Sequence, residues 1–169
     1  MPVPKIRYKF LLMRVGFGFD VHRFIPDRKL ILCGVEIPYH LGLLGHSDAD
    51  VATHALIDAL LGAAGLGDIG EHFPDSDEKY RDVSSLILLK KTIELIHNNG
   101  FKFVNADLTI VTEKPKISPY RRVMKEKLAE IIGCSPKVIN IKGKTTEKLG
   151  FTGRGEGIAA YAVALITHD

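Results

Sequence analysis

The sequence predicts a single α+β domain, an α/β sandwich with one mixed sheet of four to five strands and helices on one face. Two observations lead to this fold class. Of the 169 residues, 46% are hydrophobic and 25% are charged, the ordinary composition of a soluble globular domain of this length. In addition, short apolar segments of strand character and longer segments of helical periodicity follow one another without an internal repeat. We therefore expect one domain.

The first regular structure is a pair of predicted strands. Residues 14–21 (RVGFGFDV) alternate in character along the chain, and residues 30–37 (LILCGVEI) form an apolar segment of strand length. The residues between them, 24–29 (FIPDRK), have the composition of a turn. We expect the two strands to pair with each other as a hairpin.

A helix is expected over residues 50–65, after a loop in which Ser47 or Asp48 can serve as the N-cap. The segment is apolar around almost its whole circumference, which predicts a buried helix. Three polar residues at a spacing of four interrupt this pattern and lie on one face: Asp50, His54 and Asp58. Buried charges persist only when they are paired, hydrogen-bonded or bound to metal, so this face is expected to carry the chemistry.

The second half of the chain is divided by helix-ending and helix-starting residues. Asn99 and Gly100 are typical of a helix C-terminus, Ser118 is expected to cap a third helix, and Gly133 is expected to end it. The predicted order is a polar loop over 66–82, a helix over 82–98, a strand over 103–112, a helix over 118–133, and strands over 138–142 and 157–167.

Composition also excludes several classes of function. The net charge is only +3 and the basic residues are scattered, so we expect no nucleic-acid partner. No apolar segment has transmembrane length, and Cys33 and Cys134 form no CxxC pattern, so we expect no membrane contact and reduced thiols. Residues 1–12 are expected to be a loosely ordered extension before one domain over 13–169, in a bacterial cytoplasmic rather than a plastid protein.

A candidate metal site combines one strand and one helix. Asp20 and His22 are two residues apart, so on a strand their side chains point to the same side, and His54 lies on the predicted helix. Two imidazoles and a carboxylate suit Zn²⁺ with its fourth position open. Asp50 or Asp58, one turn from His54, could orient its imidazole. The alternative is that both histidines are only hydrogen-bonded.

A glycine-rich segment over residues 142–157 (KGKTTEKLGFTGRGEG) is a candidate diphosphate site. The hydroxyls of Thr145 and Thr146, the guanidinium of Arg154 and the close backbone approach that glycine allows suit a diphosphate, and Glu147 could hold a divalent ion on it. The order of residues is not that of a Walker A loop. A flexible glycine hairpin is the alternative.

A third candidate is the segment over residues 112–119 (TEKPKISP), which follows a predicted strand. Its proline constrains the loop, and Lys114 and Lys116 are placed to form the rim of a site for an anionic or nucleotide ligand. A solvated charged turn is the alternative at this position.

Three long blocks of the sequence resemble a known enzyme family. FGFDVHRF, LLGHSDADVATHALIDALLGAAGLGDIGEHFPD and KTTEKLGFTGRGEGIAAYAVAL occur in this order, and the similarity extends from about residue 13 to residue 166. In these blocks the chain is similar to the 2-C-methyl-D-erythritol 2,4-cyclodiphosphate synthases of the non-mevalonate isoprenoid pathway. Lys144 and Ser118 stand where some members have other residues.

The resemblance implies metal ligands and catalytic residues. Asp20, His22 and His54 match the zinc ligands of the family, and Asp58 matches a carboxylate that supports the metal site. Glu147 matches the ligand of a second ion, Mg²⁺ or Mn²⁺, between the α- and β-phosphates. The implied catalytic set is Asp58, Thr145, Thr146 and Glu147.

Substrate-binding positions are implied in the same way. His46 and Ser47 match a loop that contacts the erythritol phosphate end of the substrate. The resemblance also implies that Phe151 and Arg154 bind the substrate. The methylerythritol site matches Asp68, Ile69, Gly70, Phe73 and Asp75. The cytidine diphosphate pocket matches Thr112, Pro115, Lys116, Ile117, Gly143, Lys144, Thr145 and Thr146.

The resemblance further implies a reaction and an assembly. The family cyclises 4-diphosphocytidyl-2-C-methyl-D-erythritol 2-phosphate and releases CMP. Its members are homotrimers whose sheets meet around a three-fold axis, with active sites at the subunit junctions. A cavity on that axis, matched by Phe19, Arg154 and Glu156, can take an isoprenoid diphosphate. Two other functions remain open from the residues alone, a zinc-dependent phosphohydrolase and a trimeric binding module with a structural zinc.

Overall fold

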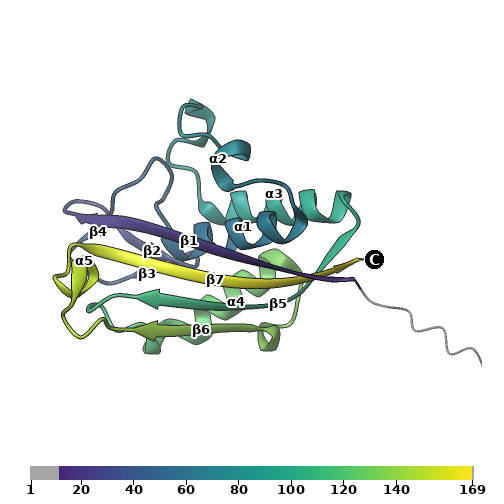
Figure 1. Ribbon diagram of the computed structural model, residues 1–169. Coiled ribbons are helices and arrows are strands. Elements are labelled where there is room, and N and C mark those ends of the chain that lie inside the picture. Colours follow the sequence, from purple (N-terminus) through teal and green to yellow (C-terminus); the bar gives the residue numbers. More distant parts are fainter. Residues whose placement is uncertain (1–11, 169) are drawn as a thin grey trace, which may run out of the picture.

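The computed structural model describes residues 12–168, so the predicted extension lies, except for Leu12, outside the described residues. A five-stranded sheet in the order β4-β1-β7-β5-β6 forms the centre of the domain (Figure 1). Only the β5–β6 pair in this sheet is parallel. The strands are β1 (Met13–Ile25), β4 (Gly42–Leu43), β5 (Phe101–Val111), β6 (Ile139–Lys144) and β7 (Gly157–His168).

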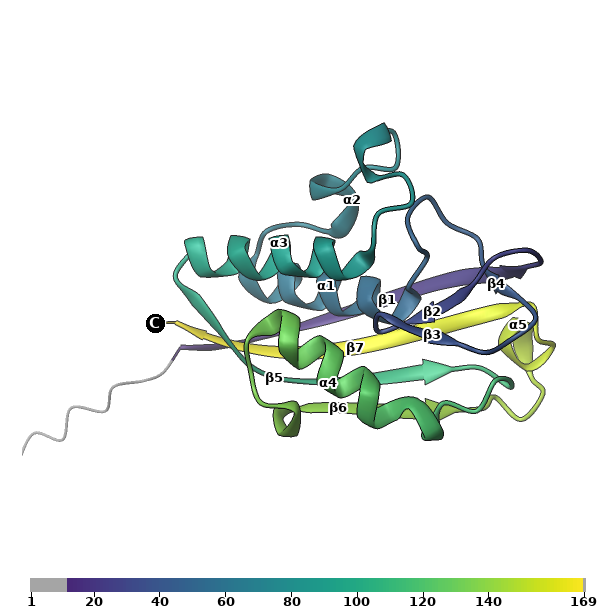
Figure 2. The same ribbon diagram turned by 180° about the vertical axis from the view of Figure 1, so that it is seen from behind.

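Three long helices cover one face of the sheet, as Figure 2 shows from behind: α1 (Val51–Ala64), α3 (Ser85–Asn98) and α4 (Arg121–Ile132). The short helices α2 (Ile69–His72) and α5 (Gly150–Gly153) lie in the connections. Within the described residues, no helix has the length and apolar character needed to cross a bilayer. The predicted mixed sheet with helices on one face is confirmed.

Helix α1 packs directly on β1 because two glycines of that strand leave room for its backbone. A Cβ atom on Gly16 would lie 1.8 Å from the carbonyl oxygen of Ala59, and one on Gly18 would lie 1.9 Å from that of Ala55. Alanines on α1 and glycines on β1 thus allow a very close helix–sheet contact. This contact brings His54, on α1, near Asp20 and His22, on β1.

The opposite face of the sheet carries large apolar side chains that no part of the described chain covers. They come from alternate positions of β1 and β7 and are between 41% and 68% exposed: Val15, Phe17, Phe19, Val21, Tyr161 and Val163. Strand β7 is therefore buried on both sides over residues 157–160, but mainly on its helix-facing side from Tyr161 onward. A contiguous apolar surface of this kind is typical of an interface between chains.

The predicted strand over residues 30–37 is wrong in its extent and its pairing. Two short strands, β2 (Leu30–Leu32) and β3 (Val35–Ile37), pair with each other in a separate two-stranded sheet, and β1 pairs with β4 and β7 instead. The chain reverses at Cys33 and Gly34, whose φ angles are 51° and 70°. The Asp50 carboxylate accepts hydrogen bonds from both of their backbone N–H groups.

Two predicted helix caps also differ. Asp50, rather than Ser47 or Asp48, is the N-cap of α1, because its carboxylate accepts a hydrogen bond from the N–H of Thr53. The same carboxylate also accepts the hydrogen bonds from the β2–β3 turn. Ser118 makes no capping hydrogen bond and begins a 3-10 turn before α4. The predicted end of α4 at Gly133 is confirmed by its left-handed conformation.

Candidate metal and substrate site

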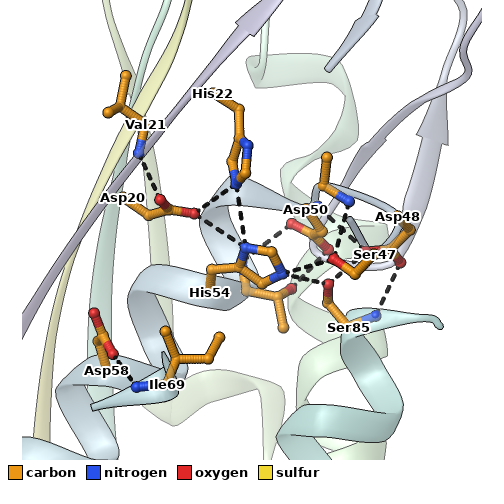
Figure 3. A network of polar contacts seen from close by, with 12 residues as sticks. Asp20, Val21, His22, Ser47, Asp48, Asp50, His54, Asp58, Ile69 and Ser85 are labelled. Carbon is orange, nitrogen blue, oxygen red and sulfur yellow. Dashed lines mark hydrogen bonds and ion pairs between the residues drawn. The ribbon is translucent and has the colours of Figure 1, made fainter. Parts of the chain in front are cut away.

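Asp20, His22 and His54 meet at the outer edge of the α1–β1 contact (Figure 3). The Asp20 Oδ2 atom lies 3.0 Å from His22 Nε2 and 3.0 Å from His54 Nδ1, and these two nitrogens are 3.3 Å apart. Asp20 and His22 lie on β1, and His54 lies on α1, 34 and 32 residues further along the sequence. The predicted triad is therefore assembled by the fold as a compact cluster.

The tautomer of His22 follows from its other ring nitrogen. His22 Nδ1 lies 2.6 Å from the carbonyl oxygen of Leu44, which can only accept a hydrogen bond. Nδ1 must therefore carry the proton, and in the neutral ring the lone pair of Nε2 points at Asp20 and His54.

The tautomer of His54 follows from a chain of three polar groups shown in Figure 3. The Ser85 hydroxyl donates a short hydrogen bond to the Asp48 carboxylate, and Ser85 Oγ lies 2.8 Å from His54 Nε2. Because the serine proton is used by Asp48, Ser85 Oγ accepts from the His54 Nε2–H group. The lone pair of His54 Nδ1 is then directed toward Asp20 and His22.

The electrostatics of the cluster follow from burial and pairing. Burial opposes ionisation of Asp20, but in the metal-free protein His22 and His54, which donate to Asp20 when their facing nitrogens carry a proton, outweigh it and hold the Asp20 pKa well below its ordinary value. Burial also lowers the His22 pKa, but the bond to Asp20 outweighs it, so the net shift is upward. Both shifts favour an ionised Asp20 carboxylate next to His22.

The three atoms fit a divalent metal ion. They lie within 4.8 Å of one another, and both histidines are fixed from behind by groups that leave the facing nitrogens free to bind. If the two histidines served only as hydrogen-bonding groups, the lone pairs of His22 Nε2 and His54 Nδ1 would not need to converge on the same point. Two imidazoles and one carboxylate are a donor set that zinc accepts while keeping a fourth position open.

A cavity of about 350 Å³ opens beside the cluster. The Asp58 carboxylate lines it, accepts from the Ile69 N–H at 2.8 Å, and has a pKa raised by burial. His46 also lines it, and its Nε2 is buried with no hydrogen-bond partner among the described residues. Other lining residues include Ser47, Gly70, Phe73, Pro74, Asp75 and Tyr80.

A second, separate cavity of about 160 Å³ lies where the parallel strands β5 and β6 end. Most of the residues predicted for the nucleotide pocket line it: Thr112, Pro115, Lys116, Ile117, Gly143, Lys144 and Thr145. Ser118, Glu113 and Arg121 complete the lining. The sheet order places β1 and β6 on opposite sides of β7, so within one chain the two cavities are distinct.

Five predicted site residues line neither cavity. Asp68 is exposed and caps α2 by accepting from the Glu71 N–H. The other four lie in the β6–β7 connection, in the order Thr146, Glu147, Phe151 and Arg154. Glu147 is exposed and accepts from the Thr145 hydroxyl at 2.6 Å. Arg154 pairs with Glu156 at 2.6 Å.

The predicted role of Asp50 as a partner that orients His54 is wrong. Its carboxylate accepts hydrogen bonds from the β2–β3 turn and from Thr53. His54 is instead hydrogen-bonded by Ser85, which in turn donates to Asp48. Ser85 could not be identified from spacing, because it lies 31 residues beyond His54 on another helix. Asp48 was visible in the sequence only as a candidate cap.

Comparison with known proteins places the chain in a family. The profile of the YgbB family matches residues 13–167. The chain belongs to the YgbB family. Its curated relatives include 2-C-methyl-D-erythritol 2,4-cyclodiphosphate synthases, such as that of Caldicellulosiruptor bescii, which is 59% identical over 155 residues, 92% of this chain and 99% of the relative. The resemblance seen in the sequence is confirmed, and the chain is an enzyme of this synthase family.

Solved structures of related proteins support the same family assignment. The bifunctional IspDF of Campylobacter jejuni is 42% identical with a TM-score of 0.91, over 94% of this chain and 43% of that one, so this chain spans less than half of the bifunctional protein. IspF of Plasmodium falciparum, solved as a CDP complex, is 32% identical with a TM-score of 0.82, over 93% and 97% of the two chains. The α+β fold of this chain is thus that of IspF.

Proposed function

We propose that this YgbB-family chain performs a metal-dependent intramolecular cyclisation. The substrate would be 4-diphosphocytidyl-2-C-methyl-D-erythritol 2-phosphate, and the products 2-C-methyl-D-erythritol 2,4-cyclodiphosphate and CMP. The observation that carries the proposal is the convergence of the facing atoms of Asp20, His22 and His54 beside a cavity of about 350 Å³. The reaction would take place in the bacterial cytoplasm.

The reaction needs no nucleophile from the protein. An oxygen of the 2-phosphate forms a bond to the β-phosphorus, and the bond from that phosphorus to the CMP oxygen breaks, so the electron pair leaves with CMP. Because the reacting groups are all anionic, catalysis depends on bringing them together and neutralising their charge. Lys116 and Lys144, which line the smaller cavity, would supply positive charge on the nucleotide side.

Two cation sites are proposed. Asp20, His22 and His54 would hold Zn²⁺, and Glu147 would hold Mg²⁺ or Mn²⁺ together with the diphosphate. When bound, these cations supply Lewis acidity and charge neutralisation to the phosphates. Asp58 would support the metal side of the cavity, while the hydroxyls of Thr145 and Thr146 would donate to phosphate oxygens.

The two cavities suit the two ends of the substrate. The larger one offers the unpartnered His46 Nε2, the Ser47 hydroxyl and the Asp75 carboxylate to a polar erythritol phosphate, with Ile69, Gly70 and Phe73 beside them. The smaller one would take the cytidine diphosphate, as in the Plasmodium falciparum relative solved as a CDP complex. Asp68 and Phe151, which line neither cavity, would add contacts to the bound substrate.

We further propose a homotrimer with each active site at a subunit junction. The exposed apolar side chains of β1 and β7 favour association, and the distinct cavities of one chain could be joined across an interface. Phe19, Arg154 and Glu156 would line a central cavity for an isoprenoid diphosphate. Loss of farnesyl diphosphate binding in Arg154→Ala would support that cavity, and unchanged binding would contradict it.

³¹P NMR of the purified protein with the diphosphocytidyl substrate and Mg²⁺ tests the proposed reaction. We expect two coupled cyclic-diphosphate resonances together with CMP, and loss of both after zinc chelation. CMP with a linear product would indicate a zinc-dependent phosphohydrolase instead. A zinc-loaded trimer without turnover would indicate a binding module.

A further inference from the structure

The turn that carries Glu147 has a backbone that must be held in place. Glu147 and Lys148 are consecutive non-glycine residues with φ angles of 51° and 66°. Residues other than glycine rarely adopt this left-handed region, and they persist in it only where the surrounding structure holds the conformation. Residues 145–148 therefore need specific interactions to keep Glu147 where it is.

Glu113 provides these interactions from the neighbouring strand. Its Oε1 atom accepts from the N–H of Thr146 at 3.0 Å and from the N–H of Lys148 at 3.2 Å. The two donors flank Glu147 directly. The other side-chain hydrogen bonds of residues 145–148 stay within the β6–β7 connection: the Thr145 hydroxyl bonds to Glu147, and the Thr146 hydroxyl bonds to Leu149 and Thr152. Glu113 is the side chain that ties this turn to β5.

The position of Glu113 follows from the parallel pairing of β5 and β6. Val111 is opposite Lys144 at the end of the pair, and the N–H of Thr112 donates to the carbonyl of Lys144 at 2.9 Å. The next residue along each chain therefore enters the loop region beside the other. Glu113 is half-buried there and also lines the smaller cavity, so it links the nucleotide pocket to the turn.

We propose that Glu113 is a positioning residue for the Glu147 cation site. Its carboxylate holds the N–H groups on both sides of Glu147, keeps the turn in its left-handed conformation, and so directs the Glu147 carboxylate toward the ion and the diphosphate. This inference rests on the proposed role of Glu147. It does not require Glu113 to touch the ion or the substrate.

Mn²⁺ titration of the zinc-loaded protein with CDP, followed by EPR, tests the inference. Glu113→Ala should weaken Mn²⁺ binding about tenfold, the size of effect seen when a residue that orients a metal ligand is lost. Glu113→Gln keeps an acceptor oxygen, so it should restore most of the affinity. Glu130→Ala, on the exposed side of α4, is the matched control and should bind Mn²⁺ like the wild type.

Glu147→Ala separates the two levels of the hypothesis. If it leaves Mn²⁺ binding intact, the proposed cation site is wrong, and the role of Glu113 falls with it. If Glu147→Ala abolishes binding while Glu113→Ala does not change it, only the Glu113 inference is overturned. Equal losses in the Gln and Ala variants would also overturn it, because an acceptor at this position would then be irrelevant.

Amide hydrogen exchange gives a readout that does not depend on the metal. The N–H groups of Thr146 and Lys148 should lose protection in Glu113→Ala, since their acceptor is removed, and should keep it in Glu113→Gln. Unchanged exchange in the Ala variant would show that Glu113 does not hold the turn.

Discussion

The metal cluster and the Glu147 turn achieve their geometry in different ways. The cluster joins a long strand to a buried helix, and each histidine is also bonded on the side away from its partners. The turn lies in an exposed connection, contains two strained residues and is tied to the end of β5 through Glu113. We infer that the first site is preorganised by the fold, whereas the second depends on a few local hydrogen bonds.

Removal of a ligand from the cluster should have the largest effect. His54→Ala should reduce Zn²⁺ affinity by more than about 100-fold, because loss of a residue that merely orients a ligand already costs about 10–100-fold. Competition with a chromophoric chelator measures this. His97→Ala, an exposed histidine near the end of α3, should behave like the wild type. Equal zinc affinity in both variants would show that the cluster is not the zinc site.

The close packing of α1 on β1 can be broken by one methyl group. Gly18→Ala places a Cβ atom 1.9 Å from the Ala55 carbonyl oxygen, so the helix must shift, at a cost of about 3 kcal/mol in the free energy of unfolding. Gly62→Ala is the matched control, because its Cβ meets nothing within 4 Å. There we expect stabilisation of about 0.5–1 kcal/mol from helix propensity.

Chemical denaturation of both glycine variants measures these opposite effects. If Gly18→Ala is as stable as the wild type, the close contact does not fix the cluster, and the contrast between the two sites weakens. A stable variant with weakened zinc binding would instead show that the contact serves the site more than the fold.

Features that depend on residues close together in the sequence could be predicted, whereas features that depend on residues far apart in the sequence could not. The buried helix over α1 and the shared side of Asp20 and His22 could be predicted because both follow from local periodicity. The β2–β3 hairpin was missed because its turn depends on Asp50, which lies 16 and 17 residues away from the N–H groups it binds. Local pattern alone favoured one strand over 30–37.

The roles of Ser85 and Glu113 could not be predicted for the same physical reason. Each acts across a tertiary contact, Ser85 from α3 onto His54 and Glu113 from the end of β5 onto the β6–β7 turn. Neither has a distinctive spacing in the sequence. The glycine-rich segment predicted a diphosphate loop, but its left-handed turn at Glu147 and Lys148 occurs at non-glycine residues that no composition signal marks.

Ser85→Ala tests whether the hydrogen bond on the side of His54 away from Asp20 contributes to zinc binding. The change removes the nearer acceptor for His54 Nε2–H and leaves only Ser47 Oγ, at 3.2 Å, so the tautomer is held less firmly and zinc affinity should fall about tenfold. Ser76→Ala, in the exposed part of the loop before α3, is the control. Unchanged affinity in Ser85→Ala would mean that the Ser85 hydrogen bond does not orient the imidazole, which would remove one basis for calling this site preorganised.

The smallest effect expected is a pH dependence that separates the two cation sites. His22 binds metal only when its facing nitrogen is unprotonated, and its pKa in the metal-free protein is raised above the ordinary 6.5 by the bond to Asp20, which outweighs burial. Zinc affinity should therefore begin to fall at a pH above 6.5 and decline up to about tenfold per pH unit below the raised pKa.

The sign is opposite for stability of the metal-free fold. A raised His22 pKa adds stability that is complete below 6.5 and is lost as the pH rises through the folded-state pKa. Zinc binding and metal-free stability should therefore change in opposite directions over this interval. Residues 145–148 contain no histidine, so Mn²⁺ binding at Glu147 should change far less above pH 6.5. Parallel pH titrations of both metals would contradict the distinction if the two curves had the same midpoint.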